Sequence, residues 1–214
     1  MSARYSWLHN VINMYIPKHF EQNDRLKSIE FMRAYNFAIL VSAKDGVPLA
    51  THIPFVIEVR EKDIVLVSHL SKANDQWKNF SDKEVLVIFS EPHAYISPSL
   101  YEKPQNVPTW NYVAVHAYGK IALVMGLEKN VAVLEKMIVA FDPSYLEQWK
   151  TLSIKYKEEL LKGIVSFEIN VTNLQGKEKL SQNKSETDRL NVQKHLEESG
   201  DELKQSLAKI MKAR

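Results

Sequence analysis

Polar side chains interrupt two apolar, strand-like segments near the middle of the sequence. Thr51-His52 lies inside the first segment, and Ser68-His69 ends the second. Ser71 and Lys72 follow, and this pattern predicts a short helix that begins at Ser71 and continues over 72–80. The free backbone N–H groups and the positive dipole at a helix start suit a phosphate group. The alternative is purely structural: Ser71 only caps the helix, and the Lys72 ammonium is solvated.

A second group of amphipathic side chains lies on the longest predicted strand, over 109–124. Trp110, Asn111 and Tyr112 stand in a row, and His116 follows on the same strand. Aromatic rings with polar edges can line a flat aromatic ligand by stacking and hydrogen bonding. Such residues also fill barrel cores and dimer interfaces, so the strand alone leaves both interpretations open.

The sequence carries no familiar catalytic or metal-binding motif. It has no His-Glu-x-x-His, P-loop, Gly-x-Gly-x-x-Gly or Gly-x-Ser-x-Gly motif, and its six glycines make a glycine-rich phosphate cradle a poor fit. Cysteine is absent, which removes disulfides, thiolate catalysis and Cys-based zinc sites. A metal held by His52, His69 and His116 is conceivable. We expect no metal and assign no catalytic residue.

Composition places the chain among ordinary globular proteins. Its 214 residues suit one domain, and 45% hydrophobic with 25% charged residues is a typical balance. The net charge is only +2, and neither half is polybasic, so no nucleic-acid-binding tail is indicated. No apolar run reaches the ~18 residues of a membrane span, and residues 1–13 make a poor signal peptide. We therefore expect a cytoplasmic protein without a membrane segment.

The elements that must position these residues are mostly strands. Tight turns join the segments between 36 and 91, and such turns connect antiparallel rather than parallel strands. Helical periodicity appears over 127–141, and capping residues predict further helices from Ser144 and Ser185. Gly119 is expected to permit a bulge or a close backbone approach. Strand-like segments cover 37–41, 49–60, 64–68, 85–89, 109–124 and 164–171, with 94–96 as an extension or a seventh strand.

Hairpins with helices at their edges predict a mainly β protein with peripheral helices, of the α+β class. The expected architecture is a closed antiparallel barrel of six or seven strands. The barrel domain is predicted to span residues 14–184, with a helical excursion at about 126–162. Residues 185–214 form a C-terminal helical segment in this scheme. Residues 1–13 form an N-terminal extension, because a new sequence block begins at Met14.

Several blocks of the sequence resemble the PaiB family, and they occur in order from Met14 to the C-terminal helices. The blocks are long and idiosyncratic, which makes the resemblance specific. They are MYIPKHF from Met14, ATHIPF from Ala50, SHLSKANDQW from Ser68, PHAYISP from Pro92, VPTWNYVAVHAYG from Val107 and KLSQNK from Lys179.

The PaiB family is described as FMN-binding negative transcriptional regulators with the FMN-binding split-barrel fold. The resemblance implies FMN as the cofactor and a homodimer with each flavin at the subunit interface. Lys72 would neutralise the phosphate, although many split-barrel enzymes use arginines there. The block from Trp110 to His116 would approach the flavin ring from the partner subunit, and the residues after the last strand would close the site. The implied cofactor-binding residues are Thr51, His52, Ser68, His69, Ser71, Lys72, Trp110, Asn111, His116, Ser181, Gln182 and Asn183.

Three functions are compatible with these observations. The first is a PaiB-type negative regulator that acts through flavin binding rather than direct operator recognition. The second is an FMN-dependent reductase or oxidase similar to pyridoxamine-phosphate oxidases or flavin reductases, and the third is a dimer that no longer uses the ligand. Direct DNA binding is left open with little support, because no helix-turn-helix is evident. The helix expected at 185–199 carries only Arg189 and Lys194 as cations.

Overall fold

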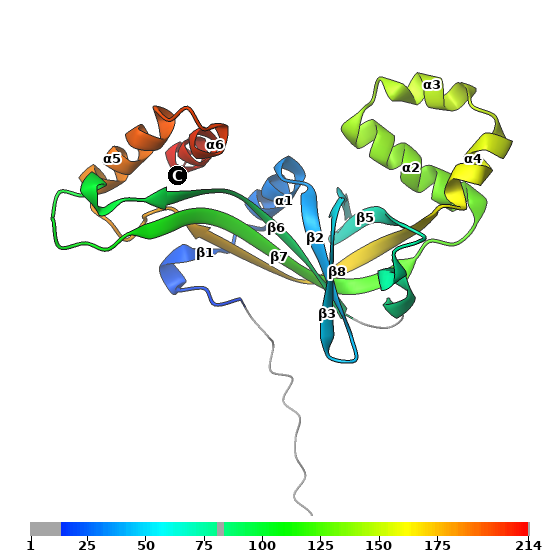
Figure 1. Ribbon diagram of the computed structural model, residues 1–214, viewed down its shortest axis with the longest axis horizontal. Helices are drawn as coiled ribbons and strands as arrows, with labels where there is room; N and C mark the ends of the chain where they lie inside the picture. Colours follow the sequence, from blue (N-terminus) through cyan, green and yellow to red (C-terminus); the bar gives the residue numbers. More distant parts are fainter. Residues whose placement is uncertain (1–13, 81–83, 214) are drawn as a thin grey trace, which may run out of the picture.

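One eight-stranded antiparallel sheet forms the centre of the protein. The computed structural model describes residues 14–80 and 84–213, so the predicted extension over residues 1–13 lies outside the described residues. The strand order is β3-β2-β6-β7-β8-β5-β4, with β1 beside β8 (Figure 1). The strands are β1 (Glu21–Gln22), β2 (Phe37–Lys44), β3 (Val47–Pro54), β4 (Val56–Arg60), β5 (Asp63–Ser71), β6 (Glu84–Ile96), β7 (Thr109–Leu123) and β8 (Ile164–Lys179).

The mainly β class is confirmed, but the number of strands is eight rather than six or seven. The segment 49–60, expected as one strand, breaks at Phe55 into β3 and β4. The segments 85–89 and 94–96 join into the single strand β6, across a register shift between Ser90 and His93. β1 has only two residues, which is too short to show the alternation that reveals a strand.

The sheet curls into a barrel whose hydrogen-bonded ladder is open, not closed as expected. Its two edge strands, β3 and β4, are consecutive in the chain and only Phe55 separates them. Consecutive strands that pair usually need a turn of about two residues, so one residue cannot close this ladder. The Phe55 N–H donates to Asn36 O at 2.9 Å, and Ser68 Oγ donates to Pro54 O at 2.6 Å. These bonds fix the corner where pairing stops.

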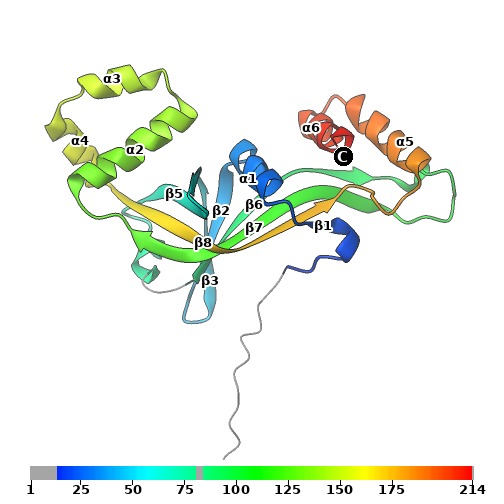
Figure 2. The same cartoon turned by 180° about the vertical axis from the view of Figure 1, so that it is seen from behind.

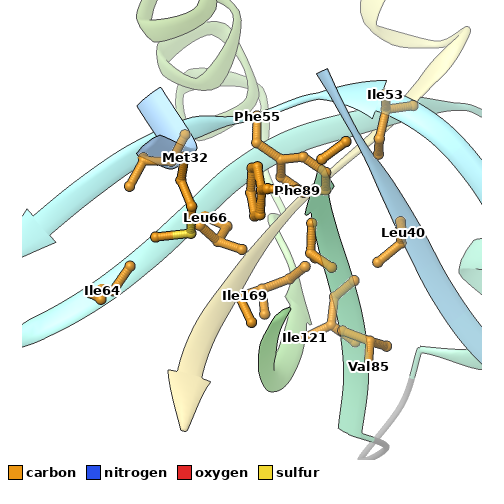
Figure 3. Packing of buried hydrophobic residues seen from close by; sticks show 14 of the residues in the cluster. Met32, Leu40, Ile53, Phe55, Ile64, Leu66, Val85, Phe89, Ile121 and Ile169 are labelled. Atoms are coloured by element: carbon orange, nitrogen blue, oxygen red, sulfur yellow. The ribbon is translucent and has the colours of Figure 1, made fainter. Parts of the chain in front are cut away.

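The inside of the curled sheet holds the main hydrophobic core (Figure 3). Phe55 is fully buried, and its ring lies 6.0 Å from that of Phe89 and 6.3 Å from that of Phe167. Helix α1 (Arg25–Ala34) adds Ile29 and Met32 to the same core. The sequence did not reveal α1, because its Leu26 is exposed while Ser28 is buried, which blurs the helical pattern.

The remaining helices gather over the two ends of the sheet (Figures 1 and 2). The helical excursion predicted at 126–162 is present as three helices beside β5. The C-terminal pair packs on the arm, which is the part of β6, β7 and β8 that extends beyond the barrel. The helices are α2 (Leu127–Phe141), α3 (Tyr145–Thr151), α4 (Ile154–Leu161), α5 (Glu186–Glu197) and α6 (Glu202–Lys212), with short 3-10 turns η1 (Lys18–Phe20), η2 (Asp75–Asn79) and η3 (Pro98–Leu100).

Hydrophobic contacts attach both helical groups to the sheet. Val133 and Met137 of α2 pack on Val65 and Val67, so β5 is buried on both faces. Val192, Leu196 and Leu207 of the C-terminal pair form a second cluster with Ala94, Ile96 and Val113 of the arm. The arm therefore has one covered face and one open face.

Of the two predicted helix caps, Ser185 is confirmed and Ser144 is not, and the close backbone approach predicted at Gly119 is present. Ser185 caps α5 by accepting the Asp188 N–H at 3.1 Å, whereas the Ser144 side chain accepts no capping bond. Gly119 lies at a register shift between β7 and β8, and an added Cβ would stand 2.4 Å from Asn170 O. Only glycine tolerates this close approach of the two strands.

The Phe55 corner makes a stability prediction. Phe55→Ala is expected to lower the free energy of unfolding by about 3–5 kcal/mol, because it removes a fully buried ring and leaves a cavity. Chemical denaturation of the purified variant measures this loss. Phe141→Ala is the control, since the Phe141 side chain is exposed and its loss should cost less than ~1 kcal/mol. Equal losses in both variants would contradict the central role of the corner.

Candidate functional site

The first predicted group lies at one end of the barrel, but the helix there differs from the prediction. β5 continues through Ser71, which pairs with Ile164 of β8. The following 3-10 helix η2 begins at Asp75, with Asn74 as its N-cap. The prediction of a helix that begins at Ser71 is therefore wrong, because the inter-strand ladder includes that residue. Ser71 and Lys72 are exposed, and Ser71 Oγ accepts only the Ala73 N–H, at 3.4 Å.

A buried glutamine ties η2 to strands β2 and β3. Gln76 is almost fully buried, and its Oε1 accepts the Thr51 hydroxyl at 2.5 Å. Asn74 Nδ2 donates to the same Thr51 oxygen at 2.9 Å. Gln76 Nε2 lies within hydrogen-bonding distance of three oxygens, Leu40 O at 3.2 Å, Ser42 Oγ at 3.1 Å and Leu49 O at 3.2 Å. Thr51 thus faces the barrel end as part of a polar network.

A cleft of about 440 Å³ opens beside this network. Thr51 and Asn74 contribute to its wall, together with Lys44 at the end of β2 and Lys78 on η2. Lys78 also forms an ion pair with Asp75 at 2.7 Å. Sequence reasoning found only Lys72 as a cation near this site. It missed Lys44 and Lys78 because the β2–β3 hairpin and η2 meet only through tertiary contacts.

Ser68 and His69 point to opposite faces of β5, as strand alternation requires. Ser68 is fully buried inside the barrel, where its hydroxyl is bound to Pro54 O. His69 points to helix α2, and its Nδ1 lies 3.1 Å from the sulfur of Met137. Burial lowers the pKa of the His69 imidazole below its usual value. Both side chains therefore contact other parts of their own chain.

His52 and His116 share the outer face of the sheet. The strand registers place His52, Ile39, Ile88, His116 and Gln175 in one row across five strands. Their chain neighbours Leu40, Val87 and Val115 belong to the core, so this row points outward. His52 is exposed and His116 is half-buried.

His116 has an unsatisfied nitrogen on this outer face. Its Nδ1 is buried and has no hydrogen-bond partner among the described residues. Burial also lowers the pKa of the His116 imidazole. A buried nitrogen of this kind costs free energy unless a ligand or another molecule satisfies it.

Trp110 and Asn111 of the second predicted group lie on the arm, apart from His116. Asn111 is fully buried beneath α6, and its Nδ2 donates to Ser181 Oγ at 2.9 Å. Trp110 points to the opposite, open face of the arm and is 51% exposed. The His93 and Tyr95 rings lie 5.7 and 6.0 Å from the Trp110 ring, so three aromatic side chains gather on that face.

The residues after the last strand have different roles. The side-chain amide of Gln182 bonds to the backbone of two preceding residues. Its Oε1 accepts the Leu180 N–H at 2.6 Å, and its Nε2 donates to Glu178 O at 2.6 Å. Ser181 adopts a positive φ of 61°, and Asn183 is exposed. Thus only Asn183 of the three presents its side chain to solvent.

The twelve residues named from the sequence do not form one site within one chain. The structure joins Thr51 to the β5–η2 junction, and it joins Asn111 to Ser181. The β5–η2 junction and the arm lie toward opposite ends of the sheet (Figures 1 and 2).

The described residues contain neither a cluster of metal-ligating side chains nor a membrane-spanning helix. Within 14–80 and 84–213, no group of three or more His, Asp or Glu side chains is placed to hold a metal ion. None of the helices in that part of the chain is long and apolar enough to cross a membrane.

Comparison with known proteins now places the chain in a family. A family model described as "Putative FMN-binding domain" matches residues 14–173. The chain belongs to this FMN-binding family. Protease synthase and sporulation protein PAI 2 of Bacillus subtilis (strain 168) is 39% identical over 202 residues, which are 92% of this chain and 96% of that protein. The resemblance to the PaiB family is confirmed, and FMN is the cofactor that the family indicates.

Further relatives and solved structures agree on the family and the fold. An uncharacterized protein of Emericella nidulans is 33% identical over 205 residues, covering 77% of this chain and 81% of its own. The flavocytochrome Anf3 from Azotobacter vinelandii has a TM-score of 0.62 at 17% identity, covering 82% of this chain and 78% of that one. The FAD and heme binding protein from Mycobacterium smegmatis has a TM-score of 0.60 at 14% identity, covering 79% and 78%. These structural matches confirm the split-barrel fold.

Two half-buried histidines, His69 and His116, make the stability depend on pH. Because burial lowers the pKa of His69 and His116, the unfolded chain binds protons more readily than the folded chain below about pH 6.5. The free energy of unfolding should therefore fall as the pH is lowered from about 7 to about 5. His69→Gln and His116→Gln should each flatten this dependence in denaturation experiments at several pH values.

An exposed histidine provides the control for this experiment. His195 lies on α5 in solvent, and His195→Gln should leave the pH dependence as it is in the parent protein. If the His69 and His116 variants keep the full dependence, the two imidazoles are not its source.

Proposed function

We propose that this protein is a PaiB-type negative regulator that works in the cytoplasm as a homodimer and acts through bound FMN. One observation carries the proposal: the outer face of the sheet presents half-buried apolar side chains around the unsatisfied nitrogen of His116. The apolar residues are Ile39 and Val41 of β2 and Leu86 and Ile88 of β6, all pointing away from the core. Such a face suits both a second subunit and a flat ligand.

The barrel-end cleft is the proposed place of the flavin phosphate. Thr51 holds Asn74 at the cleft, and the Asn74 amide keeps one N–H for a ligand. Lys44 supplies positive charge, whereas Lys78 is paired with Asp75. Lys72 stands in the turn that leads into η2 and adds a third exposed cation. Charged hydrogen bonds to an anionic phosphate are stronger than neutral ones, so these donors fit the group.

The flavin ring is proposed to lie on the outer face, along the row of His52 and His116. Because the arm is distant from the β5–η2 junction in its own chain, the exposed Trp110 would reach the ring of the partner subunit. FMN supplies hydride or electron transfer when it is bound. The protein residues would bind it, orient the ring and exclude water from one side.

Four of the residues named from the sequence are proposed to act by positioning. Ser68 fixes the Phe55 corner, and Asn111, Ser181 and Gln182 fix the end of the arm. Their polar atoms bond within the chain, so they would hold the frame of the fold in place rather than contact the flavin. Asn183, which is exposed, remains free to approach a ligand.

Direct operator recognition is not part of this proposal. Helix α5 carries only Arg189 and Lys194 as cations, which is fewer than a phosphate-tracking surface needs. The name of the Bacillus subtilis relative refers to protease synthesis and sporulation, which supports a regulatory role. We infer that the regulation passes through the flavin state or another protein.

Removal of Lys72 tests the phosphate assignment. Lys72→Ala is expected to weaken FMN binding by about 1.5–3 kcal/mol, the range for a hydrogen bond to a charged group. Quenching of FMN fluorescence during titration of the purified protein measures the change. Lys62→Ala, at the exposed β4–β5 turn, is the control and should bind FMN like the parent. Unchanged affinity in Lys72→Ala would remove Lys72 from the site.

A charge on the outer face tests the dimer. Ile88→Glu places a carboxylate at the centre of the proposed interface, where its burial costs several kcal/mol. We expect light scattering to show a monomer and FMN titration to show loss of binding. Val139→Glu, on the exposed side of α2, should leave both unchanged. A monomeric Ile88→Glu variant that still binds FMN with full affinity would show that the flavin does not lie at a subunit interface.

A further inference from the structure

A second, smaller pocket lies in the arm, apart from the barrel-end cleft. Its volume is about 180 Å³, below the roughly 300–1,000 Å³ typical of sites for whole drug-sized ligands. The residues that matter for its chemistry are Thr109, Asn111, Lys179, Ser181, Asn183 and Lys184. The size therefore suits one small group rather than a flavin ring.

Two ammonium groups at this pocket have neutral partners. Lys184 Nζ donates to Asn106 Oδ1 at 2.6 Å and lies 4.2 Å from the centre of the Tyr101 ring. Lys179 Nζ donates to Thr109 Oγ1 and lies 5.9 Å from the centre of the Phe20 ring. Aromatic faces and neutral oxygens attract a cation without cancelling its charge.

No carboxylate compensates these two charges at the pocket. No Asp or Glu lines it among the described residues, and neither lysine takes part in a salt bridge within them. Asp188 lies behind Tyr101, where burial and the Asp188 charge raise the pKa of the Tyr101 hydroxyl; this carboxylate accepts the Glu102 N–H at 2.8 Å and is not part of the lining. The lining of the pocket therefore carries two positive charges and no carboxylate.

The floor of the pocket is polar, buried and rigid. Asn111 is fully buried and Ser181 is 3% exposed, and the two side chains are bonded to each other. Ser181 is held at a positive φ of 61°, a conformation that non-glycine residues rarely adopt without local support. Asn183 stands exposed at the rim. Donors at the rim thus surround a fixed polar floor.

We propose that the arm pocket binds the phosphate group of a small ligand, at a site separate from that of the FMN phosphate. Two uncompensated cations match a dianionic phosphate better than a singly charged carboxylate. Lysine ammonium groups recognise phosphate as point charges, and the neutral oxygens that hold them leave further N–H donors for the anion. The free phosphate ion and an organic phosphomonoester share this chemistry.

Calorimetric titration of the full-length protein with inorganic phosphate, and separately with methyl phosphate, tests the proposal in a chloride buffer. Lys179→Gln and Lys184→Gln should each weaken phosphate binding at least about tenfold, with FMN affinity unchanged. The control Lys103→Gln removes an exposed lysine on the neighbouring loop and should leave phosphate binding within about twofold. Tighter binding of methyl phosphate than of free phosphate would identify an organic phosphate as the ligand, and the reverse order would identify the free ion.

A charge at the rim gives a second test that removes no protein contact of the lysines. Asn183→Asp should weaken phosphate binding several-fold by repulsion, while thermal unfolding remains as in the parent protein. Absence of saturable phosphate binding, or equal weakening in Lys103→Gln, would overturn the proposal. Loss of FMN affinity together with phosphate affinity in the Lys179 and Lys184 variants would also overturn it, because the pocket would then belong to the flavin site. Lys72→Ala keeps the two proposals distinct, since it should lower the affinity for FMN and leave the affinity for phosphate unchanged.

Discussion

The single-residue connection at Phe55 is the constraint on which the rest of the structure depends. With only Phe55 between them, β3 and β4 cannot pair, so they become the two edges of a curled sheet. The buried Phe55 ring then stands among core residues from several strands, while bonds to Asn36 and Pro54 hold the corner on both sides. The barrel is completed by side-chain packing where the backbone ladder ends. This explains why the fold stays split without exposing its core.

Curling divides the sheet into an inner face that forms the core and an outer face that carries His52, His116 and half-buried apolar side chains. Alternation along the strands then assigns neighbouring residues to different tasks. Ser68 serves the corner while His69 contacts α2, and Val115 fills the core while His116 points outward. A run of polar residues in a strand therefore does not act as one site. The chemistry of the outer face comes from residues that meet across strands.

The arm extends the same sheet beyond the core, and helices α5 and α6 cover only one of its faces. Its open face carries Trp110 with two neighbouring aromatic rings, and its end carries a pocket with two lysines. Both features lie far from the barrel-end cleft of the same chain. The two ends of the sheet therefore carry different groups of polar and aromatic side chains. Joining the open face of the arm to a flavin requires a second subunit, which is the geometric reason for the proposed dimer.

The sequence by itself determined the elements that are marked by a long, uninterrupted pattern of residue types. Strand β7 and helix α2 have the predicted bounds within one residue, because a long local pattern of apolar residues indicates the type and length of an element. The motifs from Met14 onward also determined the family, and with it FMN. The tertiary structure alone decided where the segment 49–60 breaks, why β5 continues through Ser71, and that Lys44 and Lys78 meet at one cleft. It also separated exposed candidates such as Lys72 and Trp110 from those bonded within the chain, such as Ser68 and Asn111. These outcomes depend on bonds between residues far apart in the chain, and no local pattern of residue types records such bonds.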